Sequence, residues 1–402
     1  MDKDHRGLAG RCSIMISPGH VGHLSLIALL ASGLPGCGST SRPGSYAGAP
    51  IPSVPVPTVS IAVPAAAPRA IHPAPPQLSA TIATLARNFQ GKFGIAIRAV
   101  DENWTVQASA RQRLPQQSVS KLWVAMTLLD LRDQGKIRLD QPVLVRAQDL
   151  TLFHQPIAYL VKGEGYRTTV GDLLSRALTH SDNTANDRLL TVVGGPAAVR
   201  SMIERKQLGD IRFGPGERLL QAKTAGLTWN QSYASAGGFE NARSRLSPAV
   251  RSAALDAYIA DPPDGAAPIA IADALARLAR GEILSETSTR ILLDTMGASV
   301  TGRARLRAAL PGGWRIAHKT GTGQDLGGRN AGFNDVGLLT APDGRRYALA
   351  VMIGDTRRPI RERQQLIQGV AAAVASYAGS SRSGAGASVP VAATAATTST
   401  AP

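Results

Sequence analysis

The chain has 402 residues, 44% of them hydrophobic, and a formal net charge of +16, so it is long enough to bury a sizeable core. Only eight of the 44 basic residues are lysine, and the arginines are scattered without a run of five or six like charges. A nucleic-acid site needs a basic patch with interleaved aromatic residues. We therefore expect no nucleic acid among the partners. We expect the positive charge to attract the protein to anionic envelope surfaces.

The cysteines and histidines do not support a disulfide or a metal centre in the folded region. Both cysteines, Cys12 and Cys37, precede that region. The histidines within it, His154, His180 and His318, share no metal-ligand spacing. We expect no metal and no cofactor. His180 and His318 lie beside two motifs, and we expect them to pack or to form hydrogen bonds.

The first 37 residues are typical of an export signal. Residues 21–34 form a mostly apolar stretch that is too short to span a membrane. It ends in Leu34-Pro35-Gly36-Cys37, which resembles a bacterial lipobox, in which the cysteine becomes lipidated. We predict a protein exported to the periplasm or cell envelope, with a membrane tether through Cys37. Plain cleavage and an uncleaved anchor are the alternatives.

Two segments of biased composition flank the predicted domain. Residues 38–77 are rich in Pro, Ala, Gly and Ser, and residues 379–402 are rich in Ala, Ser and Thr. Neither composition can build a core, so we expect a disordered tether and a disordered tail. The folded domain is therefore expected at residues 78–378.

Strands are expected near both ends of the domain, with most of the helices between them. A helix is expected at 79–90, followed by a hairpin of strands at 93–100 and 104–108. Further helices are expected at 118–131, 169–178, 184–193, 248–260, 267–280, 285–296 and 361–377, and further strands at 315–319, 335–340 and 347–353. The pattern predicts an α/β fold: one antiparallel sheet flanked by helices, and an inserted all-helical lobe at about residues 130–300. The active cleft would lie between sheet and lobe.

Three short motifs follow one another along this chain. In Ser118-Val119-Ser120-Lys121, the i and i+3 spacing puts a serine and a lysine on one face at a helix N-terminus. Ser181-Asp182-Asn183 precedes a helix, where an ordinary N-cap is the alternative. Lys319-Thr320-Gly321 ends an apolar strand, where a plain edge strand is the alternative. Together they supply a nucleophile, two proton carriers and an oxyanion-holding strand for serine acyl transfer.

On these motifs, the chain resembles class A β-lactamases and their serine-hydrolase relatives over roughly residues 79–378. Further stretches carry the resemblance: Thr184 to Asp187, Gly194 to Pro196, Leu275 to Met296, Thr301 to Pro311, and Asn334 to Gly337. The resemblance implies the same layout of a sheet and a helical lobe. It also implies a monomer that acts on a small β-lactam or a cell-wall peptide.

The resemblance implies catalytic roles for the motif residues. Ser118 would be the nucleophile, Lys121 would take or relay its proton, and Ser181 would protonate the leaving nitrogen. Lys319 would support Ser181 and the substrate carboxylate. The backbone N–H groups of Ser118 and Thr322 would form the oxyanion hole. We expect folding to bring the hydroxyl of Ser118 within reach of the amines of both lysines.

Other residues would bind the substrate or shape the pocket. Asn183 would hold the side-chain amide of the substrate, and Asp182 would fix the loop. The strand Thr320-Gly321-Thr322 would line the site, with both hydroxyls near the substrate carboxylate. Arg307 would support this carboxylate, with a surface arginine as the alternative. Phe153 would be an aromatic rim residue, with a core phenylalanine as the alternative.

A second base would release the acyl-enzyme. Glu217 is the candidate in Glu217-Arg218-Leu219-Leu220-Gln221, and a solvated loop carboxylate is the alternative. Gln221 stands where the family has Asn, whose side chain is one methylene shorter. The position of the hydrolytic water is sensitive to this difference in length, which can slow or redirect deacylation. A long extra segment, which contains Trp229 and Phe239, follows Gln221 until the resemblance resumes near Pro268. It can rebuild one wall of the pocket.

Three functions are compatible with this sequence. The first is an envelope serine hydrolase that opens β-lactam rings through an acyl-enzyme. The second keeps the chemistry but acts on peptidoglycan as a DD-peptidase, or works as an amidase or esterase. The third is a lipoprotein sensor that is acylated by penicillin and does not turn over.

Overall fold

The computed structural model describes residues 70–385 of the chain. The predicted export signal, Cys37 and most of the predicted tether lie outside these residues, as does the segment 386–402 of the predicted tail. None of the described helices is both long and apolar enough to cross a membrane.

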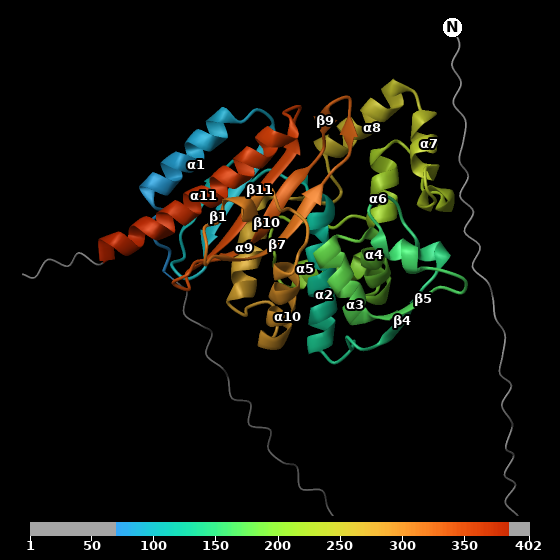
Figure 1. Ribbon diagram of the computed structural model, residues 1–402, viewed down its shortest axis with the longest axis horizontal. Coiled ribbons are helices and arrows are strands. Elements are labelled where there is room, and N and C mark those ends of the chain that lie inside the picture. Colours follow the sequence, from blue (N-terminus) through green and yellow to red (C-terminus); the bar gives the residue numbers. More distant parts are fainter. Residues whose placement is uncertain (1–69, 386–402) are drawn as a thin grey trace, which may run out of the picture. The chain divides into compact units, whose positions relative to one another are not determined.

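A five-stranded antiparallel sheet lies at the centre of the described region (Figure 1). Its strands, in spatial order, are β2 (Thr105–Ala108), β1 (Lys92–Ala99), β11 (Arg346–Asp355), β10 (Phe333–Thr340) and β7 (Arg315–Thr322). The first long strand of the domain pairs with the last one, with Ala96 opposite Ala350. The predicted fold class is therefore confirmed, and distant segments do close one sheet.

Side chains of alternating size give the sheet two different faces. Along β11, Leu349, Val351 and Ile353 point to one face, which α1 (Pro76–Asn88) and α11 (Ile360–Ala385) cover. Ala348 and Ala350 point to the opposite face. Their small side chains allow the alanine-rich α9 (Pro268–Ala279) to pack closely against β1 and β11, while α10 (Glu286–Gly297) packs against β7. We expected α9 and α10 in the lobe, so its predicted boundary at about residue 300 is wrong.

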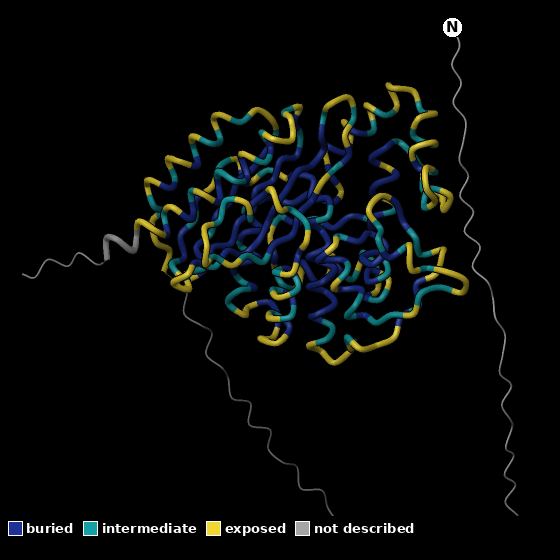
Figure 2. The backbone as a smooth tube through the Cα atoms, in the orientation of Figure 1, coloured by how far each residue is buried: buried dark blue, intermediate teal, exposed yellow. Residues whose placement is uncertain are grey.

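The lobe is built around α2 (Lys121–Asp133), whose residues from Leu122 to Leu129 are all buried (Figure 2). Around it lie α3 (Val170–Ser175), α4 (Asn183–Val192), α5 (Gly195–Arg205) and α6 (Glu217–Thr224). A two-stranded ribbon of β4 (Pro142–Val145) and β5 (Tyr166–Thr169) adds to the predicted helices, because Val143 and Val145 pack into the core of the lobe. Short helical turns complete it: η2 (Ala147–Asp149), η3 (Pro156–Leu160) and η4 (Arg176–His180).

The extra segment after α6 folds into η5 (Gln231–Ala234), α7 (Gly238–Ser244) and α8 (Pro248–Ala260). It then returns through β6 (Gly265–Ala266), which pairs with β3 (Leu114–Pro115) just before the first motif. The helical turn η1 (Gln117–Ser120), which carries Ser118, follows β3 directly. Three small elements remain: η6 (Leu306–Ala309), β8 (Asp325–Leu326) and β9 (Arg329–Asn330).

The last helix differs from its prediction. We expected it to end at residue 377 and the tail to begin at 379, but α11 continues to Ala385. Val370, Val374 and Ala378 lie on the face that packs against the sheet, and their spacing keeps the helix buried along this stretch.

Candidate active site

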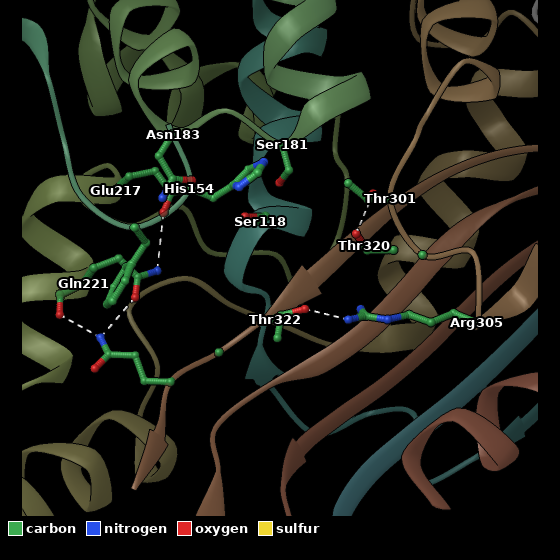
Figure 3. Close-up of a pocket in the computed structure, with 14 residues that line it drawn as sticks. Ser118, His154, Ser181, Asn183, Glu217, Gln221, Thr301, Arg305, Thr320 and Thr322 are labelled. Atoms are coloured by element: carbon green, nitrogen blue, oxygen red, sulfur yellow. Dashed lines mark hydrogen bonds between the residues drawn. The ribbon is translucent and has the colours of Figure 1, made fainter. Parts of the chain in front are cut away.

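A cavity of about 420 Å³ opens between the edge strand β7 and the helical lobe (Figure 3). It is lined by Ser118, Phe153, His154, Ser181, Asn183, Glu217, Gln221, Thr301, Gly302, Arg305, Thr320, Thr322, Gly323 and Gln324. Eight of the predicted site residues are in this set. Lys121 and Lys319 are fully buried beside it. The cleft is thus where the sequence predicted it.

Lys121 joins the first motif to the lobe. It is the first residue of α2, and its side chain is fully buried. Its Nζ donates to Ser118 Oγ over 2.8 Å and to Asn183 Oδ1 over 2.8 Å. A third bond goes to the carboxylate of Glu217, which forms an ion pair with the ammonium. Once the ammonium has given a proton to the carboxylate, the resulting amine can take the proton of the serine hydroxyl.

Lys319 occupies the opposite side of the cleft. From β7 its Nζ donates to Ser181 Oγ over 2.9 Å and to the carbonyl oxygen of Thr320 over 2.9 Å. Burial, and then the nearby charge of Lys121, hold the pKa of Lys319 well below its usual value. We expected both lysines within reach of Ser118. Only Lys121 hydrogen-bonds to Ser118, because the side chain of Lys319 extends from β7 to Ser181 in the second motif.

The second motif is an N-cap and also lines the cleft, so its two interpretations are compatible. The π-helical turn η4 ends at Ser181, whose backbone is left-handed with φ = 60°. Asp182 Oδ1 accepts the N–H of Ala185 over 2.9 Å, which caps α4. Its Oδ2 accepts the N–H of Ile157 over 2.6 Å. Burial raises the pKa of Asp182, and these two bonds oppose that effect. The loop around Ser181 is thereby fixed, as predicted.

The third motif lies where β7 passes close to the nucleophile turn. A Cβ added to Gly321 would stand 2.3 Å from the carbonyl oxygen of Gln116, so only glycine fits here. Gly321 therefore sets the approach of the strand and does not itself line the cavity, whereas Thr320 and Thr322 do.

The predicted arginine, Arg307, does not line the cleft. Arg307 donates to the carbonyl oxygens of Gly297 and Ser299, outside the cleft. Arg305 lines the cleft instead, and its Nη2 donates to Thr322 Oγ1 over 2.6 Å. Burial lowers the pKa of Arg305 to about 10. Three arginines alternate at positions 303, 305 and 307, and their spacing alone does not show which of them faces the cleft.

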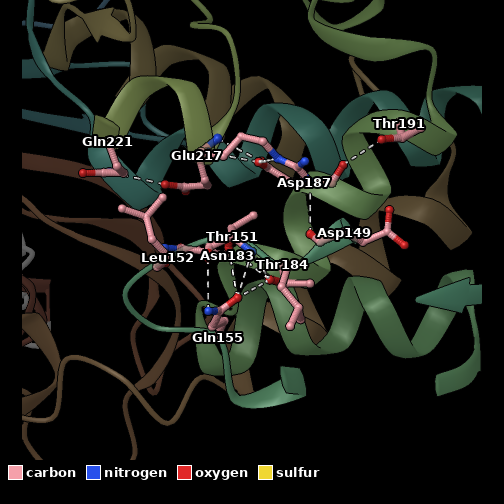
Figure 4. Close-up of polar contacts among 12 residues, drawn as sticks. Asp149, Thr151, Leu152, Gln155, Asn183, Thr184, Asp187, Thr191, Glu217 and Gln221 are labelled. Carbon is pink, nitrogen blue, oxygen red and sulfur yellow. Dashed lines mark hydrogen bonds and ion pairs between the residues drawn. The ribbon is translucent and has the colours of Figure 1, made fainter. Parts of the chain in front are cut away.

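Glu217 begins α6 and is buried, so the alternative of a solvated loop carboxylate is wrong. Asp187, from α4, accepts the N–H groups of Glu217 over 2.9 Å and of Arg218 over 3.2 Å (Figure 4). Burial, and then the charge of Glu217, raise the pKa of Asp187 to about 6. One turn after Glu217, Gln221 places its Nε2 at 3.3 Å from Glu217 Oε2. The predicted spacing of these two residues is realised on one helix face.

Phe153 is a rim residue, not a core residue. Its side chain is 44% exposed at the cleft, and its ring meets that of buried Phe239 edge-on, with centroids 4.7 Å apart. Phe239 comes from the extra segment, which therefore supports this wall as predicted. His318 is buried and shares a hydrogen bond of 2.8 Å between its Nδ1 and Asp335, and His180 pairs with Thr179.

The sequence reasoning missed six lining residues: His154, Thr301, Gly302, Arg305, Gly323 and Gln324. Thr301 and Gly302 lay in a stretch already matched to the family, so that stretch could have identified them. His154 follows the predicted rim residue and could have been found with it. Gln324 lies beyond the third motif and carries no signal of its own.

A serine whose hydroxyl is held by a buried lysine, at the boundary of an antiparallel sheet and a helical lobe, defines an active-serine hydrolase. The model of the β-lactamase enzyme family matches residues 77–378. The chain is 30% identical over 297 residues to the extended-spectrum β-lactamase PER-1 of Pseudomonas aeruginosa, covering 74% of this chain and 85% of that protein. It therefore belongs to the β-lactamase enzyme family and is a class A-like serine hydrolase.

Solved structures show the same similarity. The β-lactamase of Chitinophaga pinensis superposes with a TM-score of 0.61 at 26% identity, over 75% of this chain and 99% of that one. An ancestral class A β-lactamase superposes with a TM-score of 0.58 at 29% identity, over 75% of this chain and 99% of its own.

Proposed function

We propose that this protein hydrolyses β-lactam rings through an acyl-enzyme formed on Ser118. The observation that carries this proposal is the position of Lys121 Nζ, which hydrogen-bonds Ser118 at 2.8 Å and also pairs with Glu217. One buried ammonium thus links a nucleophile to a base. The names of the relatives, which are β-lactamases, supply the substrate class.

In acylation, Ser118 Oγ bonds to the lactam carbonyl carbon while its proton moves to the Lys121–Glu217 pair. The backbone N–H groups of Ser118 and Thr322 hold the developing oxyanion. The lactam C–N bond then breaks, and Ser181 gives its proton to the leaving nitrogen. The depressed pKa of Lys319, which is bonded to Ser181, suits it to replace that proton. The proton that the Lys121–Glu217 pair took from Ser118 then returns to Lys319, so that Glu217 is ionised again before deacylation.

In deacylation, Glu217 takes a proton from a water molecule, and the water oxygen bonds to the ester carbon. The ester C–O bond breaks, and Ser118 recovers its proton. Together, the two steps turn one lactam and one water molecule into one ring-opened amino acid, and the enzyme is regenerated.

Two groups of residues would orient the substrate. Asn183 already accepts from Lys121 and donates its Nδ2 to the Leu152 carbonyl oxygen over 3.0 Å, but its Oδ1 keeps a lone pair for the amide N–H of a substrate side chain. Arg305, with the hydroxyls of Thr320 and Thr322, suits the substrate carboxylate.

The test is turnover of a chromogenic cephalosporin by the purified protein. We expect hydrolysis by wild type and a loss of about a thousandfold or more in Ser118→Ala. Ser120→Ala is the matched control, because Ser120 lies in the same turn, outside the cavity lining, and gives α2 no side-chain cap. Hydrolysis by Ser118→Ala at the wild-type rate, or no hydrolysis by wild type, contradicts the proposal. Muropeptide substrates would then test the second hypothesis.

The cellular location is also a proposal, and its support comes from the sequence alone. We propose an exported protein that is tethered to a membrane through lipidated Cys37. Cys37→Ser should move the protein from the membrane fraction to the soluble one. An unaltered membrane fraction argues against lipidation.

A further inference from the structure

Three glutamines from distant parts of the chain meet behind Glu217. Gln117 precedes the nucleophile, Gln221 lies in α6, and Gln324 follows β7. All three are buried. Gln324 Nε2 donates to Gln221 Oε1 over 3.1 Å, and Gln221 Nε2 donates to Gln117 Oε1 over 2.9 Å. Their side-chain amides therefore form a head-to-tail chain.

The orientation of the three amides decides whether an N–H donor or a carbonyl oxygen of Gln221 faces the Glu217 carboxylate. An amide presents a carbonyl oxygen at one end and two N–H donors at the other. Gln221 turns its oxygen toward Gln324 and its Nε2 toward both Gln117 and Glu217, at 3.3 Å from Oε2. A donor facing the carboxylate hydrogen-bonds to Oε2 and so fixes the position of the group that takes a proton from water. If the Gln221 amide were reversed, its carbonyl oxygen would face the carboxylate oxygen of Glu217, and no hydrogen bond could form.

Two residues near the end of the extra segment fix the orientation of the Gln117 amide. Tyr258, in α8, accepts from Gln117 Nε2 over 2.7 Å and donates to Asp264 Oδ2 over 3.2 Å. Asp264 Oδ2 also accepts the backbone N–H of Gln117, so it is an acceptor, and the tyrosine hydroxyl donates to it and accepts from Gln117. This leaves Gln117 Oε1 to face Gln221. The Gln117 amide also donates to the carbonyl oxygen of Ala331 over 3.2 Å, in the same sense.

The same carboxylate holds the backbone beside the nucleophile. Asp264 Oδ2 accepts the backbone N–H of Gln117 over 2.8 Å. Gln117 has φ = 54°, a left-handed conformation that a residue other than glycine adopts at a cost. Asp264 thus stabilises an unfavourable conformation one residue before Ser118.

We propose that Tyr258 and Asp264 are positioning residues for deacylation: through Gln117 they orient Gln221 so that it presents an N–H to Glu217. This inference rests on the proposed function, because it assigns Glu217 to the water step. It gives the extra segment a role in releasing the acyl-enzyme, beyond shaping the pocket wall.

The experiment compares Tyr258→Phe with wild type. The variant keeps the ring, which packs in one cluster with Leu220 and Leu255, and removes only the hydroxyl. Acylation and deacylation rates are measured separately by rapid mixing and intact mass. We expect deacylation to slow about tenfold and acylation to change less than about threefold. kcat and KM should then fall together at constant kcat/KM, and the acyl-enzyme should accumulate.

Tyr233→Phe is the matched control, because Tyr233 lies in the same extra segment but outside the amide chain. It should behave as wild type. A purely structural role for Tyr258 would lower the unfolding midpoint without separating the two rates. Equal deacylation rates for Tyr258→Phe and wild type overturn the inference.

Failure of the inference is distinguishable from failure of the proposed function. If wild type does not hydrolyse the cephalosporin, the proposed function fails. The same comparison is then made with p-nitrophenyl acetate, which acylates an active serine without a lactam ring. Slower release of acetate by Tyr258→Phe supports the inference. Equal release, or no acylation by either probe, overturns it.

Discussion

Glu217 pairs with Lys121 in a buried site, although 96 positions separate the two residues along the chain. The carboxylate comes from α6 and the ammonium from α2, and neither side chain has more than 4% of its surface exposed. Each charge compensates the other in a medium that penalises an isolated ion. The pair therefore has a structural consequence as well as a chemical one.

Removing one partner should destabilise the fold more than removing both charges. Lys121→Met leaves the Glu217 carboxylate buried without an opposite charge, which costs about 3–5 kcal/mol. Lys121→Met combined with Glu217→Gln removes both charges and should recover most of that loss. Denaturant unfolding measures both variants. A double variant as unstable as the single one would show that the pair does not compensate charge.

Glu217→Gln alone should trap the acyl-enzyme. The amide cannot take a proton from water, so deacylation should slow at least about a hundredfold while acylation persists. Intact mass after mixing with penicillin should show a stable adduct of one equivalent. Turnover at the wild-type rate would contradict the role of Glu217.

Arg305→Ala should weaken binding of carboxylate-bearing substrates. Loss of the charge-assisted contact should raise KM about tenfold, with a smaller change in kcat. Arg307→Ala is the matched control, because it removes an arginine two positions away that bonds only outside the cleft. Equal effects of the two substitutions on KM would refute the assignment.

Asp187 should make stability depend on pH in the acid range. Burial raises the pKa of Asp187 from 3.8 to about 6, so the folded state favours its neutral form. Its contribution is therefore fully present below pH 3.8 and is lost as the pH rises through about 6. The difference in unfolding free energy between wild type and Asp187→Asn should fall by on the order of 3 kcal/mol across this range. A difference that is constant with pH would contradict this.

The sequence predicted the parts of the site that depend on local spacing. Ser118 and Lys121 stand three residues apart, Ser181 and Asn183 precede a helix, and Glu217 lies four residues before Gln221. Each of these relationships survives folding, because a helical turn or a cap determines it. The fold class followed from the order of strands and helices in the same way.

The sequence could not predict contacts that depend on how distant elements approach each other. Arg305 lines the cleft because it reaches Thr322 on β7, whereas Arg307 bonds to the carbonyl oxygens of Gly297 and Ser299. The hydrogen bond from Lys319 to Ser181 depends on which residue of β7 lies opposite the second motif once sheet and lobe have packed together. Tyr258 reaches Gln117 only because α8 folds back toward β3 across 141 positions of sequence. None of these is encoded in a local pattern.

The pairing of β1 with β11 also has a consequence for biosynthesis. β1 can pair with β2 as soon as both strands have left the ribosome, but its other edge stays unpaired until residues 346–355 are made. An open strand edge invites pairing with other chains, so the nascent protein is most prone to aggregate during this interval. A chain that stops before β11 would have made every residue of the cleft and still lack the strand that joins β1 to β10.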